Sequence, residues 1–258
     1  QCSTNKVWSI DMGVHAGPKD SLETGVVKDG LVFWVNAADE ASYPGSGTTW
    51  TDVVGGATGT LTNGPVYDRS LPGVSFNFDG SNDQVEFADS DTFSFGDASN
   101  DSAFSVDCWI NAVDMTRFRI VSKANEWLMG PFGDDKMGIL LLDNNSSNYI
   151  GRTSSVTVQS VAGADQNEWI SLTTTYDGSD GSGIAHYLNG SAMSLDSPIS
   201  AGSYTAMHNQ SSVLNIGTNA DFGSFANGEI ASVRLYNKAL TADEVATNYR
   251  IEKKRYGR

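Results

Sequence analysis

The sequence predicts an all-β protein, a two-sheet antiparallel β-sandwich of jelly-roll type with a short C-terminal helix. Nearly all its apolar runs are short and alternate with a period of two, as half-buried strands do. Glycine (27 residues) far outnumbers proline (6), which favours many strands joined by tight turns. With 258 residues, of which 39% are hydrophobic, the chain is long enough to bury one large core.

Short strands are expected along most of the chain. Residues 1–25 are polar and weakly patterned, so they are expected to form an N-terminal arm before a domain that spans 26–249. An Asn189-Gly190 pair predicts a hairpin, since both central positions of a type I′ turn need positive φ. The expected strands are Leu31–Asn36, Val74–Phe78, Val85–Phe87, Phe104–Ile110, Met137–Leu142, Trp169–Tyr176, Ile184–Leu188, Val213–Ile216 and Ile230–Tyr236.

One helix is well marked near the C-terminus. Thr241 stands three residues before Glu244, the pattern of a capping box. Leu240 and Val245 occupy the flanking positions of a hydrophobic staple. The helix is therefore expected from about Ala242 to the early 250s.

The charge of the chain and the length of its apolar runs argue against nucleic-acid binding and membrane insertion. It holds 16 Lys and Arg against 31 Asp and Glu, a formal net charge of −15. Such a body repels phosphate backbones and anionic lipid headgroups, so nucleic acid is not an expected partner. No apolar run approaches the roughly 20 residues needed to cross a bilayer, so membrane insertion is not expected either.

The last nine residues, 250–258, form a basic tail with a net charge of +4. Exposed ion pairs contribute only about 0–1 kcal/mol each, so ordering such a tail also requires apolar burial. We therefore expect the tail to dock on another protein, with the acidic surface of the sandwich itself as the alternative. The expected docking residues are Arg250, Lys253, Lys254, Arg255, Tyr256 and Arg258.

Short motifs follow one another in a fixed order from residue 30 onward. They are Gly30–Trp34, Tyr43–Asp52, Thr60–Pro65, Phe78–Asp83, Phe104–Ile110, Tyr176–Gly178, Tyr187–Gly190 and Gly228–Tyr236. The series resembles the laminin-G-like, concanavalin-A-like domains of bacterial secreted proteins and bacteriophage structural proteins. The ending from Asn248 to Gly257 looks most like marine phage members. Ala231 departs from the family, which often has an acidic residue at that position.

A tight turn contains Asp79, Asn82 and Asp83, three oxygen donors within five residues. Such donors suit Ca²⁺, and the resemblance implies that calcium is common at rims of this kind. The alternative is that they are turn formers whose side chains bond their own backbone. Nine acids and no base lie between residues 79 and 114, which indicates either a solvated acidic face or a surface that attracts cations.

A second candidate site contains Asp107, Trp109 and Asn111, which alternate on one face of an expected strand. An indole flanked by polar groups can stack on a sugar ring and hydrogen-bond its hydroxyls, so glycan binding is one interpretation. Packing in the core or at the rim of the sandwich is the other. Cys108, on the opposite face, is expected to be a small buried residue.

No group of residues has the pattern of a catalytic centre. Glycosidases need two carboxylates at a defined separation, and the nearest pair, Asp89 and Asp91, is expected in a loop. His15, His186 and His208 are isolated and predict no catalytic triad. The two cysteines form no disulfide framework, and no Cys/His cluster has zinc spacing.

The leading expectation is a non-enzymatic protein on the surface of a phage virion, which the resemblance implies. It would be a capsid decoration, fibre or tail-associated module that contacts other virion proteins or copies of itself and binds host glycans. One alternative is a secreted or cell-surface bacterial carbohydrate-binding module. Another is a polysaccharide-degrading enzyme of the same fold.

Overall fold

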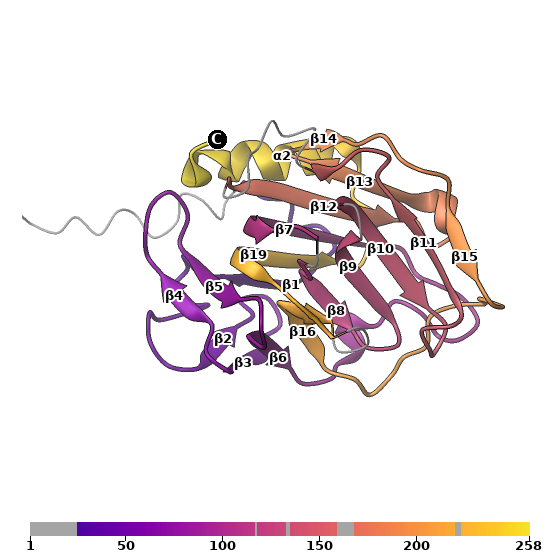
Figure 1. The fold of residues 1–258 in the computed structure, drawn as a ribbon, viewed down its shortest axis with the longest axis horizontal. Helices are drawn as coiled ribbons and strands as arrows, with labels where there is room; N and C mark the ends of the chain where they lie inside the picture. Colours follow the sequence, from indigo (N-terminus) through magenta and orange to yellow (C-terminus); the bar gives the residue numbers. More distant parts are fainter. Residues whose placement is uncertain (1–24, 117, 133–134, 159–167, 220–222) are drawn as a thin grey trace, which may run out of the picture.

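The computed structural model describes residues 25–116, 118–132, 135–158, 168–219 and 223–258. It confirms the expected sandwich, since two large antiparallel sheets pack face to face (Figure 1). The expected N-terminal arm, residues 1–25, lies outside the described residues apart from Gly25. Within the described ranges, no helix combines the length and apolar character that a membrane span requires.

The first sheet, called sheet A, has eight strands. Its longest strands, β7 and β19, are neighbours at its centre, and β19 pairs with β5 along its first half and with β1 along its second. In spatial order the strands are β14 (Ser191–Ala192), β13 (Ile184–Leu188), β12 (Ile170–Tyr176), β7 (Phe104–Asp114), β19 (Asn227–Tyr236), β5 (Ser75–Asp79) and β4 (Val66–Asp68), with β1 (Leu31–Asn36) beside β19.

The second sheet, sheet B, has nine strands. They are β15 (Ile199–Ala201), β11 (Tyr149–Thr153), β10 (Lys136–Leu142), β9 (Trp127–Phe132), β8 (Val121–Lys123), β16 (Leu214–Ile216), β6 (Gln84–Phe87), β3 (Thr58–Thr62) and β2 (Thr49–Thr51). A small separate hairpin joins β17 (Thr218–Asn219) to β18 (Ser224–Phe225). Short 3₁₀ turns cover Asp91–Phe93 and Gly181–Gly183.

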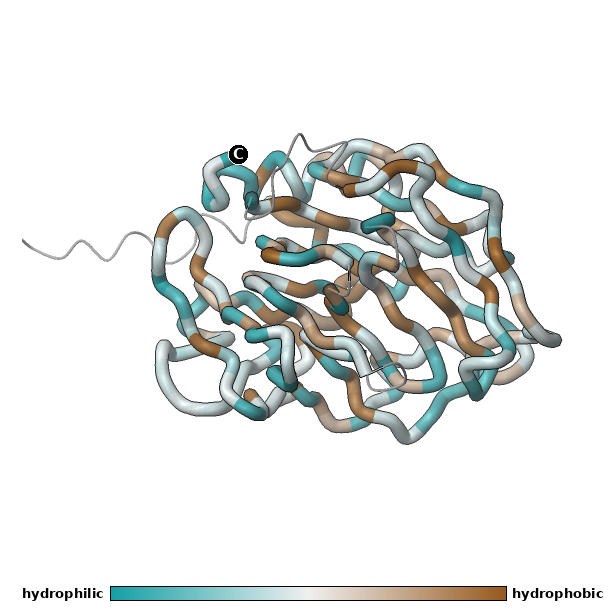
Figure 2. Tube along the Cα trace, viewed as in Figure 1, coloured by the Kyte–Doolittle hydropathy of each residue, from teal (hydrophilic) through white to brown (hydrophobic). Residues whose placement is uncertain are grey.

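The core lies between the inner faces of the sheets. In β5, Phe76 and Phe78 are fully buried whereas Asn77 and Asp79 are exposed, as the period-two pattern predicts. Phe33 of sheet A meets Phe87 of sheet B edge to face, with ring centroids 5.0 Å apart. Figure 2 shows hydrophobic segments along the strands and hydrophilic ones in many of the connecting loops. Burial of this face stabilises the sandwich.

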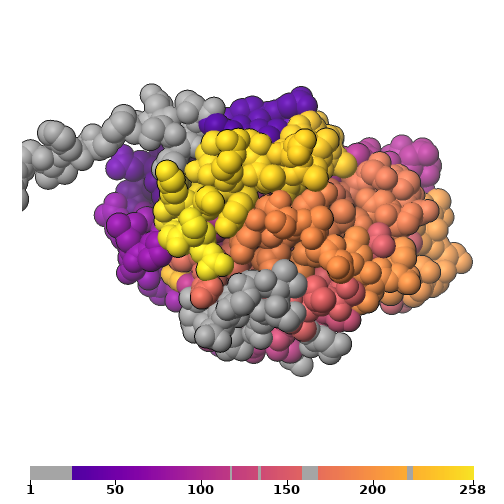
Figure 3. All heavy atoms as spheres, turned by 90° about the horizontal axis from the view of Figure 1, so that it is seen from above, coloured from indigo at the N-terminus to yellow at the C-terminus, as the bar shows by residue number. Residues whose placement is uncertain are grey.

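The expected C-terminal helix is confirmed as α2 (Ala242–Glu252). The Thr241 hydroxyl accepts a hydrogen bond from the Glu244 amide, and the Glu244 carboxylate accepts one from the Thr241 amide at 2.8 Å. This capping box fixes the start of the helix. A 3₁₀ turn, η3 (Lys253–Tyr256), then carries the chain to its end. Figure 3 shows this C-terminal segment lying against the body of the sandwich.

The basic tail packs on the sandwich of its own chain, which is the alternative to docking on another protein. Tyr256 is only 1% exposed and stacks on Trp109 with ring centroids 4.0 Å apart. Trp169 covers the same tyrosine from a second direction, at 5.0 Å. Arg258 forms an ion pair with Glu168 at 2.6 Å. The expectation that the tail needs a partner to become ordered is therefore corrected: aromatic burial within the chain supplies the contact.

A buried ion network lies beneath the same helix. The Arg234 guanidinium on β19 pairs with the Asp107 carboxylate at 2.7 Å and with the Glu252 carboxylate. Glu252 also accepts a hydrogen bond from the Trp109 indole at 2.9 Å. Asn248 donates to Asp107 at 2.9 Å. Sheet A and helix α2 thus share one set of buried charges.

His186 on β13 lies in the interior of the protein. It is fully buried, and its ring nitrogens lie 2.8 Å from the Thr174 hydroxyl and 3.0 Å from the Arg152 carbonyl oxygen. Burial lowers the pKa of His186 from 6.5 to about 4. The folded protein therefore disfavours the protonated ring.

We expect the unfolding free energy to fall as the pH drops through the window set by His186. In the unfolded chain the ring binds its proton near pH 6.5, whereas the folded state resists it down to about pH 4. The stability that this histidine contributes is therefore complete above pH 6.5 and lost toward pH 4, by at most about 1.4 kcal/mol per pH unit. Urea unfolding across this window should show a flatter pH dependence for His186→Gln than for the wild type. Parallel curves would contradict the assignment.

Tyr256→Ala is expected to cost roughly 3 kcal/mol of unfolding free energy, because it removes a buried ring between two tryptophans. The control is Arg250→Ala, at an exposed position of the preceding helix α2, which should change stability by less than about 0.5 kcal/mol. Urea unfolding followed by tryptophan fluorescence measures both. Equal, small effects would show that the tail does not stabilise the sandwich.

Candidate functional site

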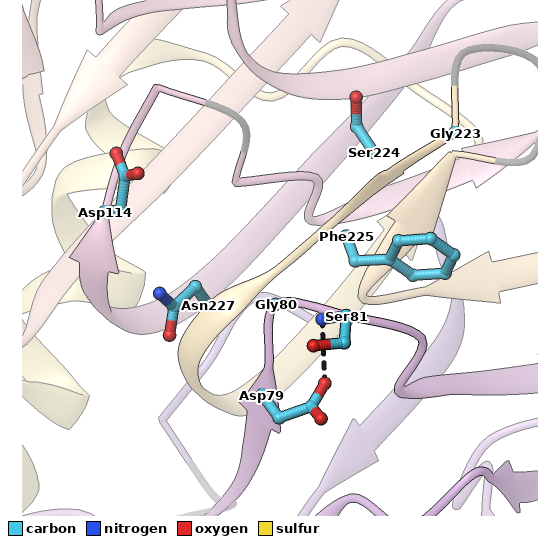
Figure 4. A pocket seen from close by; sticks show the side chains of 8 residues that line it. All are labelled: Asp79, Gly80, Ser81, Asp114, Gly223, Ser224, Phe225 and Asn227. Atoms are coloured by element: carbon cyan, nitrogen blue, oxygen red, sulfur yellow. Dashed lines mark hydrogen bonds between the residues drawn. The ribbon is translucent and has the colours of Figure 1, made fainter.

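A pocket of about 310 Å³ lies at one end of sheet A, where β5, β7 and β19 approach the hairpin of β17 and β18 (Figure 4). Its wall is mostly polar, with one aromatic ring. The lining residues are Asp79, Gly80, Ser81, Asp114, Gly223, Ser224, Phe225 and Asn227. We call it the Asp79–Asp114 pocket.

Strand register brings three polar residues into one row. Asn227 on β19 is paired with Asp79 on β5 on one side and with Asp114 on β7 on the other. Neighbouring strands lie about 4.8 Å apart, so the two acidic residues are roughly 10 Å apart across the row. Asn227 thus stands between two acidic residues in the sheet.

The hairpin supplies the apolar part of the wall. Phe225 is half-buried and is paired with Thr218 across the hairpin. Ser224 beside it is 8% exposed. Neither the Ser224 hydroxyl nor the Asn227 amide makes a hydrogen bond to another described side chain or backbone group, so both can serve a ligand.

The turn after β5 holds Asp79 in place. One oxygen of its carboxylate accepts hydrogen bonds from the backbone amides of Ser81 at 2.8 Å and Asn82 at 3.4 Å. These bonds lower the pKa of Asp79, the Ser81 amide most, so the side chain is ionised near neutral pH. Gly80 has φ +77°, and a Cβ there would lie 2.9 Å from the Cβ of Asn227. Only glycine fits this turn against the pocket wall.

Two of the three expected calcium ligands, Asp79 and Asp83, accept hydrogen bonds from backbone amides of their own turn. Asp83 is 3% exposed and accepts a hydrogen bond from the Asp79 amide at 3.0 Å, and burial raises its pKa. The carbonyl oxygen of Asn82 accepts a hydrogen bond from the Asn63 side chain. Across the described ranges, no three His, Cys, Asp or Glu side chains are grouped to hold a metal ion. The donors around Asp79, Asn82 and Asp83 therefore do not by themselves form the six- to eight-oxygen shell that Ca²⁺ takes.

The expected glycan surface at Asp107, Trp109 and Asn111 is also corrected. Trp109 is 1% exposed because Tyr256 and Tyr249 stack over it. Asp107 is buried in the ion network, and Asn111 is half-buried and donates to Glu229 at 2.9 Å. No indole face is left for a sugar, so the packing interpretation holds.

Two of the expected docking residues remain open to solvent. Arg250 and Lys254 are exposed and lie four residues apart at the end of α2 and in η3. Arg255 donates to Asn36 at 3.2 Å, and Lys253 lies 5.7 Å from the ring centre of Tyr249. Most of the tail thus contacts its own domain.

The effect of a chelator on the melting temperature tests whether a calcium ion stabilises the turn after β5. We expect the melting temperature to be the same in excess chelator and in added calcium, because Asp79 and Asp83 already bond backbone amides. Differential scanning calorimetry of chelator-dialysed protein measures this. A lower melting temperature that calcium restores would instead show a structural ion.

A model of the concanavalin A-like lectin/glucanases superfamily matches residues 79–246. No curated protein sequence matches the chain.

Several solved toxin domains have a similar fold. The binding domain of botulinum neurotoxin DC in complex with SialylT is 15% identical, with a TM-score of 0.59 over 86% of this chain and 51% of that one. The binding domain of Paraclostridial Mosquitocidal Protein 1 is 16% identical, with a TM-score of 0.60 over 85% and 52%. The receptor-binding domain of botulinum neurotoxin type G is 16% identical, with a TM-score of 0.56 over 87% and 52%. The chain spans about half the length of these proteins, and at this identity the likeness is one of fold. Because the family model covers well over half of the sequence and the fold agrees, the chain belongs to the concanavalin A-like lectin/glucanase superfamily.

Proposed function

We propose that the chain is a non-enzymatic binding module that holds a glycan in the Asp79–Asp114 pocket. The observation that carries this proposal is the meeting of one aromatic ring with several hydrogen-bonding groups in a single hollow. A sugar ring has an apolar face of C–H groups and a rim of hydroxyls. An aromatic wall with a few placed polar groups suits such a ligand.

Each part of the pocket has a separate task in this proposal. Phe225 offers its ring to the apolar face of the sugar. Asn227 both donates and accepts through its amide, and the carboxylates of Asp79 and Asp114 accept from hydroxyls. These groups come from strands and short turns, so little conformational entropy is lost when a ligand binds.

The Asp79 carboxylate lacks the property that a catalytic proton donor needs. A glycosidase of the inverting kind needs two carboxylates about 6.5–9.5 Å apart, and one of them must be a proton donor with a raised pKa. Hydrogen bonds from backbone amides shift the pKa of Asp79 in the opposite direction. Asp79 is therefore a poor general acid near neutral pH, and we propose binding without turnover.

A place on the surface of a phage virion is part of the proposal, and its support is the sequence resemblance described above. Attachment there needs a surface away from the pocket. The exposed bases Arg250 and Lys254 offer one, since they suit an acidic patch on another virion protein or on a second copy of this acidic chain. Among solved structures of similar fold, the binding domain of botulinum neurotoxin DC is in complex with rat synaptotagmin II, and the cell entry of botulinum neurotoxin type C is dependent upon interaction with two ganglioside molecules.

A glycan array followed by calorimetric titration tests the proposed site. We expect at least one glycan to bind the wild type and Phe225→Ala to weaken that binding roughly tenfold, the equivalent of about 1.4 kcal/mol for a lost stacking contact. Asn227→Ala should weaken it by a similar factor. The control is Asn77→Ala, an exposed asparagine of the same sheet that does not line the pocket and should leave affinity unchanged.

Absence of any bound glycan on the array would overturn the proposed function. Binding that persists unchanged in both pocket variants would move the site elsewhere on the protein.

A further inference from the structure

The Asp79–Asp114 pocket is charged with one sign. Its lining contains two carboxylates and no basic side chain. Neither carboxylate forms an ion pair with a lysine, arginine or histidine of the described residues. Elsewhere in the protein, acids such as Asp107 and Asp196 do have basic partners. The pocket therefore presents negative charge that the described chain does not neutralise.

The position of these charges makes them act on a bound ligand. The row of Asp79, Asn227 and Asp114 puts an acidic residue on each side of Asn227, on strands that lie roughly 5 Å from its own. Distances of this size are shorter than the Debye length of about 8 Å at physiological ionic strength, so salt does not screen the interaction away. A negative group on the ligand is repelled from both sides, whereas a positive group is attracted from both.

The uncharged polar groups of the pocket do not oppose this selection. Ser224 is 8% exposed, and its hydroxyl has no hydrogen-bond partner among the described residues. The side-chain amide of Asn227 has none there either. Both groups donate as well as accept, so they fit hydroxyl, amine and amide groups alike. Discrimination by charge is left to the two aspartates.

We infer that the pocket selects saccharides without negative charge, favours those with a free amino group, and rejects sialylated and uronic-acid glycans. The inference rests on the proposed function and specifies its ligand class. It separates this chain from botulinum neurotoxin type C, whose cell entry is dependent upon interaction with two ganglioside molecules, since gangliosides carry acidic sugars. Asp79 and Asp114 are the specificity-determining residues.

Matched glycans that differ only in charge test the inference. For each neutral glycan that binds, we expect its sialylated or uronic-acid counterpart to bind at least tenfold more weakly, and the counterpart with a free amine to bind more tightly. The Asp79→Asn/Asp114→Asn double variant should reduce the difference between acidic and neutral members to about threefold or less. Asparagine keeps the oxygen that accepts from the Ser81 and Thr116 amides, so the turns are retained.

A matched control is Asp97→Asn. Asp97 accepts from the amides of Ser99 and Asn100 in the same way as Asp79 accepts from its turn, but it lies outside the pocket lining. This variant should discriminate between acidic and neutral glycans as the wild type does. If the double variant does not fold, the single Asp114→Asn variant replaces it in the comparison of acidic and neutral glycans.

The outcomes separate the two proposals. Wild-type protein that binds acidic glycans as tightly as neutral ones overturns the charge selection while glycan binding stands. Discrimination that survives in the double variant also overturns it, because the two aspartates would not be its source. Wild-type protein that binds no glycan of any charge overturns the proposed function and the inference with it.

Discussion

The buried Arg234 guanidinium is the constraint on which the outer face of sheet A depends. A charge removed from water is costly unless it is paired and hydrogen-bonded, and removal of one partner of such a pair typically costs about 3–5 kcal/mol. One partner, Asp107, comes from the neighbouring strand, but the other, Glu252, comes from helix α2. The sheet therefore holds its central charge in a stable state only when the C-terminal helix is docked. Tyr256 and Trp109 add aromatic burial beside it.

Strand β19 connects this helix contact to the pocket. Arg234 lies near one end of the strand and Asn227 at the other, roughly 23 Å apart at the rise of an extended chain. A β-bulge between Ile230 and Ser232 changes the alternation, so that Ile230 and Val233 both face the core while Arg234 and Asn227 lie on the outer side. One half of the outer face is thus closed by the helix, and the other half holds the Asp79–Asp114 pocket.

Local patterns in the sequence predicted the parts of the fold that local physics determines. The bounds of β1 and the start of α2 follow from apolar alternation and from the capping box of Thr241. The pairing of strands that are distant in the sequence leaves no such local pattern. Asp79, Asp114 and Asn227 become neighbours only through the registers of β19 with β5 and β7, so the sequence indicated Asp79 alone and for a different task. The alternation of Trp109 is that of an outer face, which left glycan binding and packing both open, and no local pattern reveals a helix packed above it. The short strands β2 to β4, β8, β9 and β11 also lacked a clear apolar period.

Charge is distributed unevenly over a chain with a net charge of −15, and this bears on how such a module would be oriented. The exposed bases Arg250 and Lys254 belong to the helical segment that covers the Arg234 half of the outer face. Acidic residues border the pocket at the Asn227 half. Like charges repel and unlike charges steer partners toward each other, so an acidic neighbour approaches the helix and is repelled from the pocket. Attachment through the helix would therefore leave the pocket free to meet a glycan, and the two binding tasks would not compete for one surface.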